Sequence, residues 1–485
     1  MRVATSTGLG AFLLTASSIV NAIELDINST DSILRASSTI VQNILQIYNN
    51  GSDTGPPIPG LLPDPYYWWE AGYMFDSLIN YWSLSGNDSI VQTIQEGMLF
   101  QTGPDNDYLP PNQTRNLGND DQALWALASM TAAEKGFPLP SGSNVTWIQL
   151  AENVFNEHVA RWDDDTCNGG LRWQLFTFNN GYNYKNSISQ GTFAYLGARL
   201  ARYTGNSTYS DWAQKAVDWT RNVKLLTSDG AIYDGTDATL NCSELNHIQW
   251  TINAGLFMNT ASYLVNISQS SAWNDLLWPV FLESTKIFTD AGASANSQGR
   301  SIITEVACTM EDNCNVDQKA YKATLARALN IFQSQTASSP STFNGTSSSD
   351  AYSRAAAILR ASAEGAAAQC SGGDDGTTCG FDWSSSTWDG TSGMGQELNA
   401  LEVLLANLPA KALNTANDTS IAGSGGSGSN STSTEESGGS NSTGTSTGSA
   451  ESASSSTSGA AGLWSSSAFV ALFSAIAISV LRLSL

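Results

Sequence analysis

The chain has 485 residues, with 44 acidic and 21 basic side chains and a formal net charge of -23. This excess of negative charge argues against nucleic acid or anionic lipid as a partner, because their phosphates would be repelled. The chain contains two histidines, His158 and His247, and no phosphate-cradling or metal-binding motif, so we expect neither a histidine-based triad nor a cofactor or metal.

Residues 1–22 predict a secretory signal peptide. Arg2 precedes an apolar stretch that includes Ala11–Leu14, and Val20-Asn21-Ala22 supplies small residues for cleavage after Ala22. Asn-x-Ser/Thr sequons in such a chain predict N-glycosylation. They occur at Asn28, Asn50, Asn87, Asn112, Asn144, Asn206, Asn241, Asn266, Asn344 and Asn417, and also at Asn430 and Asn441.

The first two predicted helices differ in character. Residues 33–48 have an amphipathic helical pattern, and a Gly/Pro-rich loop follows through Pro65. Residues 66–82 are apolar nearly all round, which is typical of a helix buried inside a larger assembly. The second helix should stop at Ser85-Gly86-Asn87, and another should begin near Asp88.

Two adjacent carboxylates, Asp120 and Asp121, come directly before a run of strong helix formers that reaches Met130. Because Gly118 and Asn119 interrupt what precedes, we expect Asp120 to be the N-cap and Asp121 to lie one residue into the helix. Acidic residues at a helix start also stabilise its dipole, so plain capping is an alternative explanation.

Helices continue to follow helices along the rest of the chain, and convincing period-2 strands are scarce. Hairpin-like pairs recur at irregular spacings, which favours a toroid of paired helices over a regular solenoid. We therefore predict an all-α barrel. Its later helices are expected at residues 190–206, 207–223, 250–265, 272–288, 318–334, 351–368 and 395–408.

Six cysteines in a secreted chain imply disulfides, whose connectivity the sequence alone does not determine. Short spacing favours Cys308 with Cys314 and Cys370 with Cys379. That pairing leaves Cys167 with Cys242.

The C-terminal part predicts a tether. Residues 416–458 are almost wholly Ser, Gly, Thr and Asn, as in a flexible stalk. Residues 459–485 have the layout of a GPI-anchor signal that is removed after attachment, tentatively at Ser458. A transmembrane helix is the alternative, but the apolar tail is shorter than the roughly 20 residues a bilayer requires. Residues 23–415 remain for the folded domain.

The remaining chemistry is that of carboxylates. Two carboxylates flanking a sugar are the usual apparatus of glycoside cleavage, and close like charges should separate their titrations. Asp163-Asp164-Asp165 could ligate calcium, but the pattern of a calcium loop is absent and a solvated loop is favoured. Trp and Tyr faces stack on sugar rings. Candidates for that role, each of which could instead be a core residue, are Trp68, Trp69, Trp125, Trp162, Trp173 and Trp383.

The run from Asn119 to Ala128 resembles the Asp-Asp signature of glycoside hydrolase family 76, the endo-α-1,6-mannanases. Further pieces occur in the family's order, and the likeness covers nearly all of residues 30 to 410. They are Gly169-Gly170-Leu-Arg-Trp173, Tyr184-Lys185-Asn186, Ala198-Arg199-Leu200, Thr251-Ile-Asn253-Ala-Gly255 and Gln396-Glu397. The run Pro63–Gly72 and the two terminal signals resemble the fungal cell-wall branch.

The resemblance implies an (α/α)6 barrel and a retaining mechanism, with Asp120 as nucleophile and Asp121 as acid/base. It also suggests substrate-binding roles for a wider set of residues. These are Trp68, Trp69, Glu70, Asn119, Gln122, Trp125, Arg172, Trp173, Asn186, His247, Asn253 and Glu397.

For the fungal branch, the resemblance implies a mannosidase or transglycosidase that acts on the mannose core of GPI anchors or on mannan. Cell-wall glucan would be the acceptor, so that GPI-proteins become attached to the wall. The enzyme would lie at the outer face of the plasma membrane, with the GPI lipid as its only membrane contact. The alternative is a wall-glycan-binding or scaffold protein without turnover.

Overall fold

The computed structural model describes residues 22–50, 52, 55–115, 117–267, 271–291, 301–309, 311–336, 342–343 and 345–409. Outside these residues lie almost all of the predicted signal peptide, the stalk and the anchor signal with Ser458, and the sequons at Asn344, Asn417, Asn430 and Asn441. In the part of the chain that is described, no helix combines the length and hydrophobicity needed to cross a membrane.

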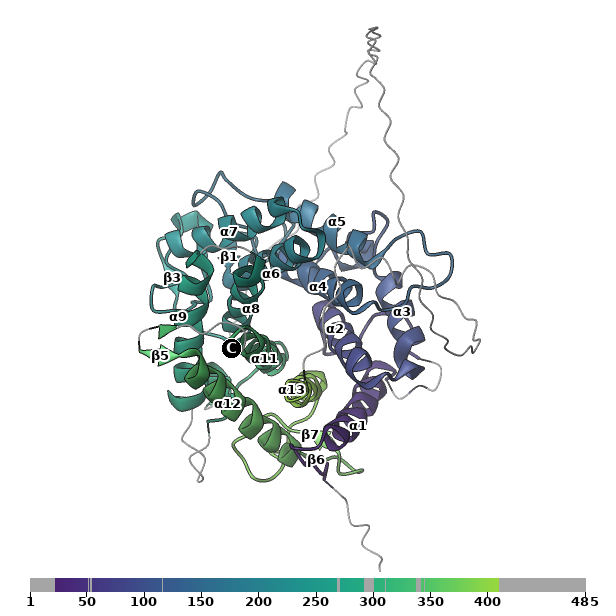
Figure 1. Ribbon diagram of the computed structural model, residues 1–485. Helices are drawn as coiled ribbons and strands as arrows, with labels where there is room; N and C mark the ends of the chain where they lie inside the picture. The colour runs from purple at the N-terminus through teal and green to yellow at the C-terminus, as the bar shows by residue number, and fades with distance from the viewer. Residues whose placement is uncertain are drawn as a thin grey trace, which may run out of the picture. The chain divides into compact units, whose positions relative to one another are not determined.

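Six helices of the described residues form an inner ring around the barrel axis (Figure 1). Each contacts the next, and the last contacts the first, so the ring is closed. In chain order they are α2 (Trp68–Ser85), α4 (Asn119–Lys135), α6 (Ser187–Thr204), α8 (Thr251–Ile267), α11 (Lys322–Thr336) and α13 (Met394–Leu405).

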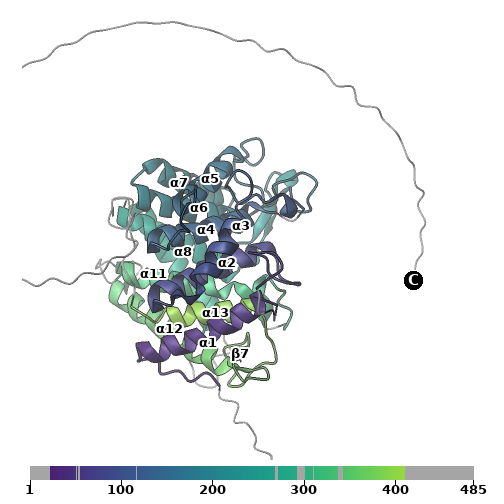
Figure 2. The same ribbon diagram turned by 90° about the vertical axis from the view of Figure 1, so that its right-hand side faces the viewer.

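A second ring of helices covers the first from outside. Helix α13 packs against α1, and the other inner helices pack against the outer helix that follows each in the chain; Figure 2 shows α1 and α13 side by side. The outer helices are α1 (Thr30–Tyr48), α3 (Val91–Phe100), α5 (Trp147–Ala160), α7 (Ser207–Asn222), α9 (Asn274–Thr285) and α12 (Ser348–Gln369). The predicted (α/α)6 barrel is confirmed.

Helix α2 shows why the inner ring needs apolar or small residues on every face. Its residues from Trp68 through Ile79 are all buried, as the all-round apolar pattern predicted. At Gly72 the backbone approaches Trp125 of α4 so closely that an added Cβ would lie 2.8 Å from the indole ring. The close approach fixes the two helix starts against each other.

Most predicted helices are found, with shifted ends. Gln318–Ala320 forms a separate 3-10 turn, η6, so α11 begins at Lys322. The end predicted for α9 continues as a π-helix, η5 (Lys286–Ala291). Helix α5 (Trp147–Ala160) was not predicted from the sequence, and helix α10 (Val306–Thr309) is a single turn.

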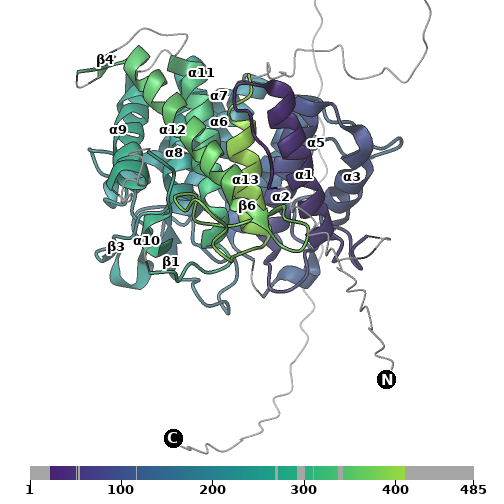
Figure 3. The ribbon, with the colours of Figure 1, turned by 90° about the horizontal axis from the view of Figure 1, so that it is seen from below.

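Short strands lie in the connections between helices. Strand β2 (Gly235–Asp237) pairs antiparallel with β1 (Tyr184–Asn186) and β3 (Leu245–Asn246). Figure 3 shows β1, β3, β6 and α10 at the same end of the barrel. The other strands are β4 (Thr342–Phe343), β5 (Thr346–Ser347), β6 (Cys370–Gly372) and β7 (Thr378–Cys379), and the remaining 3-10 turns are η1 (Asp88–Ile90), η2 (Pro111–Gln113), η3 (Ala238–Leu240) and η4 (Ser271–Trp273).

Three disulfides pair all six cysteines as their spacing favoured. They join Cys167 to Cys242, Cys308 to Cys314, and Cys370 to Cys379. The first bond links two connections 75 residues apart in sequence, so it constrains the unfolded chain most.

The described sequons are accessible. Asn28, Asn50, Asn112, Asn144, Asn206 and Asn241 are exposed, and Asn87 is partly exposed. Asn266 is described by its backbone alone, in α8. Occupancy of these sites stays a prediction.

Candidate active site

A cleft of about 700 Å³ opens at the end of the barrel where the inner helices begin. First-turn residues of α2, α4, α6 and α8 line it, together with Gln318 of η6 and the flanking Asp317 and Tyr321. Helix starts carry partial positive charge from the backbone N–H groups. The cleft therefore favours carboxylates and developing negative charge at its floor.

Helix α4 begins two residues earlier than the sequence predicted. Gly118 is the N-cap, with φ -95° and ψ 162°, so Asn119 opens the helix and Asp120 is not the cap. The reason is that Asn119 N–H donates to the carbonyl oxygen of Trp173 at 2.8 Å, while Asp121 reaches back to the Gly118 N–H. A neighbouring loop thus replaces the side-chain cap expected of Asp120.

The two adjacent carboxyl groups have different partners. Asp121 Oδ2 accepts from Gly118 N–H at 2.7 Å. Asp120 Oδ1 accepts from Asp121 N–H at 3.0 Å, and Asp120 Oδ2 accepts from Asn186 Nδ2 at 3.0 Å. Both residues line the cleft, although the Asp120 residue is only 5% exposed. Asp120 is thus solvated by fixed donors on both oxygens.

These environments separate the titrations of the pair. Burial raises the pKa of Asp120 to about 6, against the opposing hydrogen bonds from Asn186 and from backbone N–H groups. Burial, and next the charge of Asp120, raise the pKa of Asp121 well above its ordinary value. As pH rises, Asp120 therefore ionises first and Asp121 keeps its proton.

Asn186 connects the pair to the neighbouring inner helix. It ends β1 and caps α6, where its side-chain oxygen accepts from Ser189 N–H at 3.1 Å. Its amide nitrogen is therefore turned toward Asp120. One side chain both starts α6 and supports the ionised form of Asp120.

Tryptophans form the apolar walls of the cleft. Trp68, Trp69 and Trp173, three of the tryptophans expected to stack on sugar rings, line it. Trp125 lies behind them in the core: its ring stacks on Trp68 at 5.0 Å, and its Nε1 donates to the Trp68 carbonyl oxygen. Trp162 and Trp383 are also buried and do not line the cleft.

Several residues suggested for substrate binding lie outside the cleft lining. These are Glu70, Asn119, Gln122, Trp125, Arg172, His247, Asn253 and Glu397. Most have structural contacts instead. Glu70 Oε2 accepts from Tyr67 N–H, Gln122 Nε2 donates to the Asp107 carbonyl oxygen, and Glu397 Oε1 accepts from Cys379 N–H.

His247 and Asn253 have different surroundings again. His247 is exposed, with its ring edge against Tyr233 at a centroid distance of 4.5 Å. Asn253 is fully buried within α8. Neither residue reaches the cleft.

The connection between α5 and α6 supports the start of α4. Asn119 donates from its side chain to the Arg172 carbonyl oxygen at 2.8 Å, and Arg172 forms an ion pair with Asp163 at 2.8 Å. Asp163, the first residue of the acidic triplet, also pairs with Lys185. This acidic residue therefore has a structural role in the loop.

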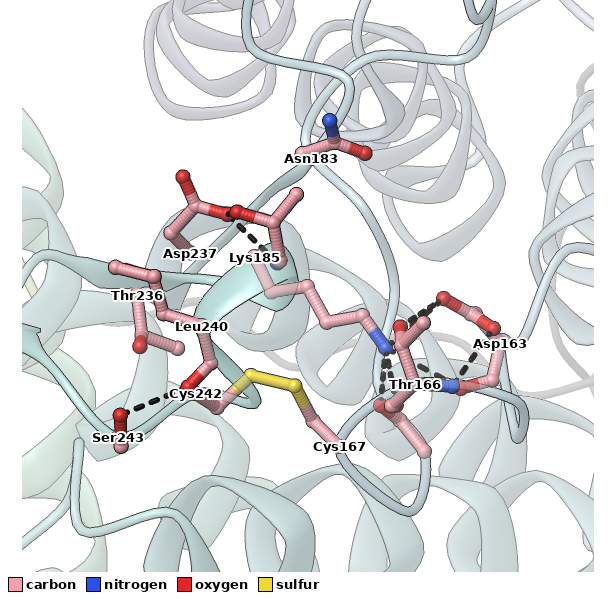
Figure 4. The surroundings of a disulfide bond; sticks show 12 residues. Asp163, Thr166, Cys167, Asn183, Lys185, Thr236, Asp237, Leu240, Cys242 and Ser243 are labelled. Carbon is pink, nitrogen blue, oxygen red and sulfur yellow. Dashed lines mark hydrogen bonds and ion pairs between the residues drawn. A yellow bond between two sulfur atoms is a disulfide. The ribbon is translucent and has the colours of Figure 1, made fainter.

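Lys185 is buried and gathers that connection around its ammonium group (Figure 4). Its Nζ donates to the carbonyl oxygens of Asp163, Thr166 and Gly169 at 3.2, 2.8 and 2.5 Å. The Cys167–Cys242 disulfide lies beside it and ties the same loop to the connection after β2. The loop that fixes Asn119 is thus anchored on two sides.

Three carboxylates of the cleft, Asp64, Asp234 and Asp317, were not anticipated from the sequence. Asp234 accepts from Trp250 Nε1 at 2.8 Å and from the Tyr184 hydroxyl at 2.6 Å. Asp317 accepts from Trp69 Nε1 at 2.8 Å, and its pKa is raised by burial. Asp317 lies just before a helix start, the same signal that drew attention to Asp120; Asp234 follows no comparable pattern.

A pair of carboxylates in an aromatic cleft is the usual apparatus of glycoside hydrolases. Residues 32–419 match the profile of glycosyl hydrolase family 76. The chain belongs to this family of glycoside hydrolases.

Fungal relatives resemble the chain over most of its length. Mannan endo-1,6-alpha-mannosidase DCW1 of Saccharomyces cerevisiae is 40% identical over 423 residues, covering 86% of this chain and 89% of that protein. The enzyme of the same name from Candida albicans is 41% identical over 392 residues, covering 80% and 82%.

Solved structures share the fold. Dfg5 from Chaetomium thermophilum, crystallised with glucosamine, matches with a TM-score of 0.72 and 34% identity, covering 81% of this chain and 94% of that one. An inactive variant of an α-1,6-mannanase from Salegentibacter, in complex with α-1,6-mannotriose, matches with a TM-score of 0.59 and 16% identity, covering 77% and 98%.

Proposed function

We propose that this protein is a retaining α-1,6-mannosidase or transglycosidase that acts on the mannose core of GPI anchors and attaches GPI-proteins to cell-wall glucan. The observation that carries the proposal is the pair Asp120 and Asp121, held at one helix start with separated titrations. The names of the fungal relatives support an α-1,6-mannoside as the bond cleaved.

In the first step, ionised Asp120 attacks the anomeric carbon of the mannoside. A bond forms between that carbon and an Asp120 oxygen while the glycosidic bond breaks, and Asp121 gives its proton to the departing oxygen. In the second step, Asp121 takes a proton from the acceptor hydroxyl, whose oxygen attacks the same carbon and releases Asp120. Water in place of the acceptor gives hydrolysis.

The contacts of the pair explain how Asp121 serves both steps. While Asp120 is ionised, its charge helps keep the pKa of Asp121 high, which favours the acid form. Once Asp120 carries the sugar as a neutral ester, that contribution disappears. The pKa of Asp121 then falls, and its carboxylate can act as base.

The charge of the cleft supports a donor that carries an amino sugar beside the mannoside. Asp64, Asp234 and Asp317 line the cleft together with the catalytic pair, and Arg115 is the basic residue among the described lining residues. A protonated amine would reduce the mutual repulsion of these carboxylates. The related Dfg5 structure contains glucosamine, which has such an amine.

The two terminal signals support a location for the protein. We propose that the mature protein is secreted and held by a GPI lipid at the outer face of the plasma membrane. Treatment of intact cells with a phospholipase specific for phosphatidylinositol should release it. Retention in the membrane after such treatment would instead indicate a spanning tail.

Product analysis tests the reaction. The full-length protein is incubated with a GPI-core oligosaccharide, with and without a β-glucan acceptor, and the configuration of new products is followed by NMR. Retained configuration and a glucan-linked product are expected. Hydrolysis alone would contradict transfer, and inverted configuration would contradict Asp120 as nucleophile.

The second candidate is a wall-glycan-binding or scaffold protein without turnover. Its aromatic cleft would serve for binding alone. Asp120→Asn and Asp121→Asn discriminate: a scaffold should still complement cell-wall defects after both changes, whereas an enzyme should not.

A further inference from the structure

Two phenylalanine rings lie stacked on the loop that forms part of the cleft rim. The ring centroids of Phe176 and Phe178 are 5.2 Å apart, and the ring planes differ by 8°. Phe178 is 69% exposed, the highest value among the large hydrophobic side chains of the described residues. Gln174 and Asn180 of the same loop line the cleft, so the pair lies between two cleft residues in the sequence of this loop.

The loop holds this pair in a defined position. Asn179, between the loop's two ends, donates to the Thr114 carbonyl oxygen and to Gln174 Oε1, both at 3.1 Å. Leu175 N–H donates to the Leu117 carbonyl oxygen at 3.2 Å. Gly181 packs so tightly on Trp173 that an added Cβ would lie 2.3 Å from the ring. An exposed aromatic surface fixed in this way loses little entropy on binding.

The chemistry of the surface selects the kind of sugar. A phenyl ring has no hydrogen-bonding group, so it binds through its face to a flat apolar surface. A β-linked glucose unit has equatorial hydroxyls and presents C–H groups on its ring faces, whereas the axial hydroxyl of mannose interrupts one of them. A neutral chain also avoids repulsion from a protein with net charge -23.

We propose that Phe178, backed by Phe176, is a binding subsite for a β-linked glucan acceptor whose end enters the cleft. This inference rests on the transfer reaction proposed above. The contact lies outside the catalytic pair, so it should govern which acceptor is used, and long acceptors should benefit more than short ones.

Transfer kinetics test the subsite in the full-length protein. A β-1,3-glucose disaccharide and longer oligomers of the same linkage serve as acceptors with a fixed α-mannoside donor. Phe178→Ala should raise the concentration of long acceptor needed for half-maximal transfer by about fivefold to tenfold, the loss expected for one aromatic contact. The disaccharide should show little difference, and Phe178→Trp should restore the preference for long acceptors.

Phe100→Ala provides a matched control. Phe100 is also highly exposed, at 60%, but belongs to α3, none of whose residues line the cleft. It should leave the acceptor preference unchanged. Equal behaviour of Phe178→Ala and Phe100→Ala with long acceptors would overturn the proposal, as would an equal loss with acceptors of every length.

Direct binding separates failure of the subsite from failure of the proposed reaction. Retention on insoluble β-1,3-glucan is measured for the wild type and both alanine variants, each also carrying Asp120→Asn to remove turnover. Selective loss of retention in Phe178→Ala supports the subsite even if no transfer is detected. Undiminished retention of Phe178→Ala, or no retention of any protein, would reject the subsite even if the enzyme is active.

Discussion

Helices α2 and α4 begin with the same hydrogen bond but meet the cleft differently. In α2, Glu70 Oε2 accepts from Tyr67 N–H at 2.8 Å; in α4, Asp121 Oδ2 accepts from Gly118 N–H at 2.7 Å. The N-cap residues share a ψ of 162°. Each acid therefore lies at the third helical position and reaches back to its cap.

The two helix starts differ in what precedes and surrounds that acid. Glu70 is fully buried, does not line the cleft, and its second oxygen has no hydrogen-bond partner. Asp121 lines the cleft. The residue before each acid is Trp69 in α2 and Asp120 in α4. The same backbone arrangement thus presents an aromatic wall in one place and a reactive pair in the other.

Asp120→Asn should give the largest effect. It removes the nucleophile while keeping a similar shape, so kcat/KM should fall by on the order of 10⁴-fold or more. A carboxyl-to-amide change in α2, Glu70→Gln, should stay within a few-fold of the wild type because Glu70 does not reach the cleft. Steady-state kinetics with a mannoside donor measure both, and equal losses would remove the distinction between the two helix starts.

Asp121→Asn should lower kcat/KM by roughly 10² to 10⁴-fold with an ordinary donor, the usual range for a general acid. A donor whose leaving group needs no protonation should recover much of the first step. Asparagine keeps an acceptor for Gly118 N–H, so circular dichroism should show an intact fold. An undiminished defect with the activated donor would argue against Asp121 as the general acid.

Asn186→Ser and Asn186→Ala should move the pH profile. Both lose the hydrogen bond that lowers the pKa of Asp120. That pKa therefore rises further, and the acid limb of kcat/KM shifts to higher pH. A loss of about tenfold to a hundredfold is expected on the acid side.

The two Asn186 variants control for one another. Serine can still cap α6, whereas alanine cannot, so only Asn186→Ala should also lose about 1 kcal/mol of stability. Thermal unfolding measures that difference. An unshifted acid limb in both variants would show that Asn186 does not tune Asp120.

The starts of α2 and α4 show which features of the site can be predicted from local sequence and which depend on distant contacts. Helix propensity and the Gly-Asn interruption located the start of α4 to within two residues. They could not reveal that the Trp173 carbonyl oxygen would take the Asn119 N–H, because that contact crosses more than 50 residues. For the same reason Glu70 and Asn119 were grouped with the binding residues although they support the backbone.

Tertiary contacts also decided which isolated residues reach the cleft. Asp317 and Asp234 come from connections whose placement depends on ring closure, and no local pattern marks Asp234 as a cleft residue. Trp68 and Trp125 look alike in sequence, yet one lines the cleft and the other supports it from behind. Local periodicity identified helices and apolar faces; the lining of the cleft depends on the closed ring.

Glu70→Gln, which should have the smallest effect on turnover, should change the stability of the protein. Burial raises the pKa of Glu70 to about 8 from its ordinary value near 4.5. In the folded protein Glu70 therefore stays protonated over a range where the unfolded chain ionises. Its contribution to stability is fully present below about pH 4.5 and is lost as pH rises toward 8. Glutamine does not titrate, so Glu70→Gln should raise the unfolding midpoint progressively across this window.

Asp121→Asn provides the parallel measurement at α4. Its pKa is also raised by burial, so this variant should likewise gain stability over the wild type as pH rises above the ordinary carboxyl range. The two helix starts should thus respond alike in thermal unfolding and differ only in turnover. A midpoint difference that does not vary with pH in Glu70→Gln would mean that Glu70 is already ionised in the folded protein. The two capping acids would then differ in charge state as well as in access to the cleft.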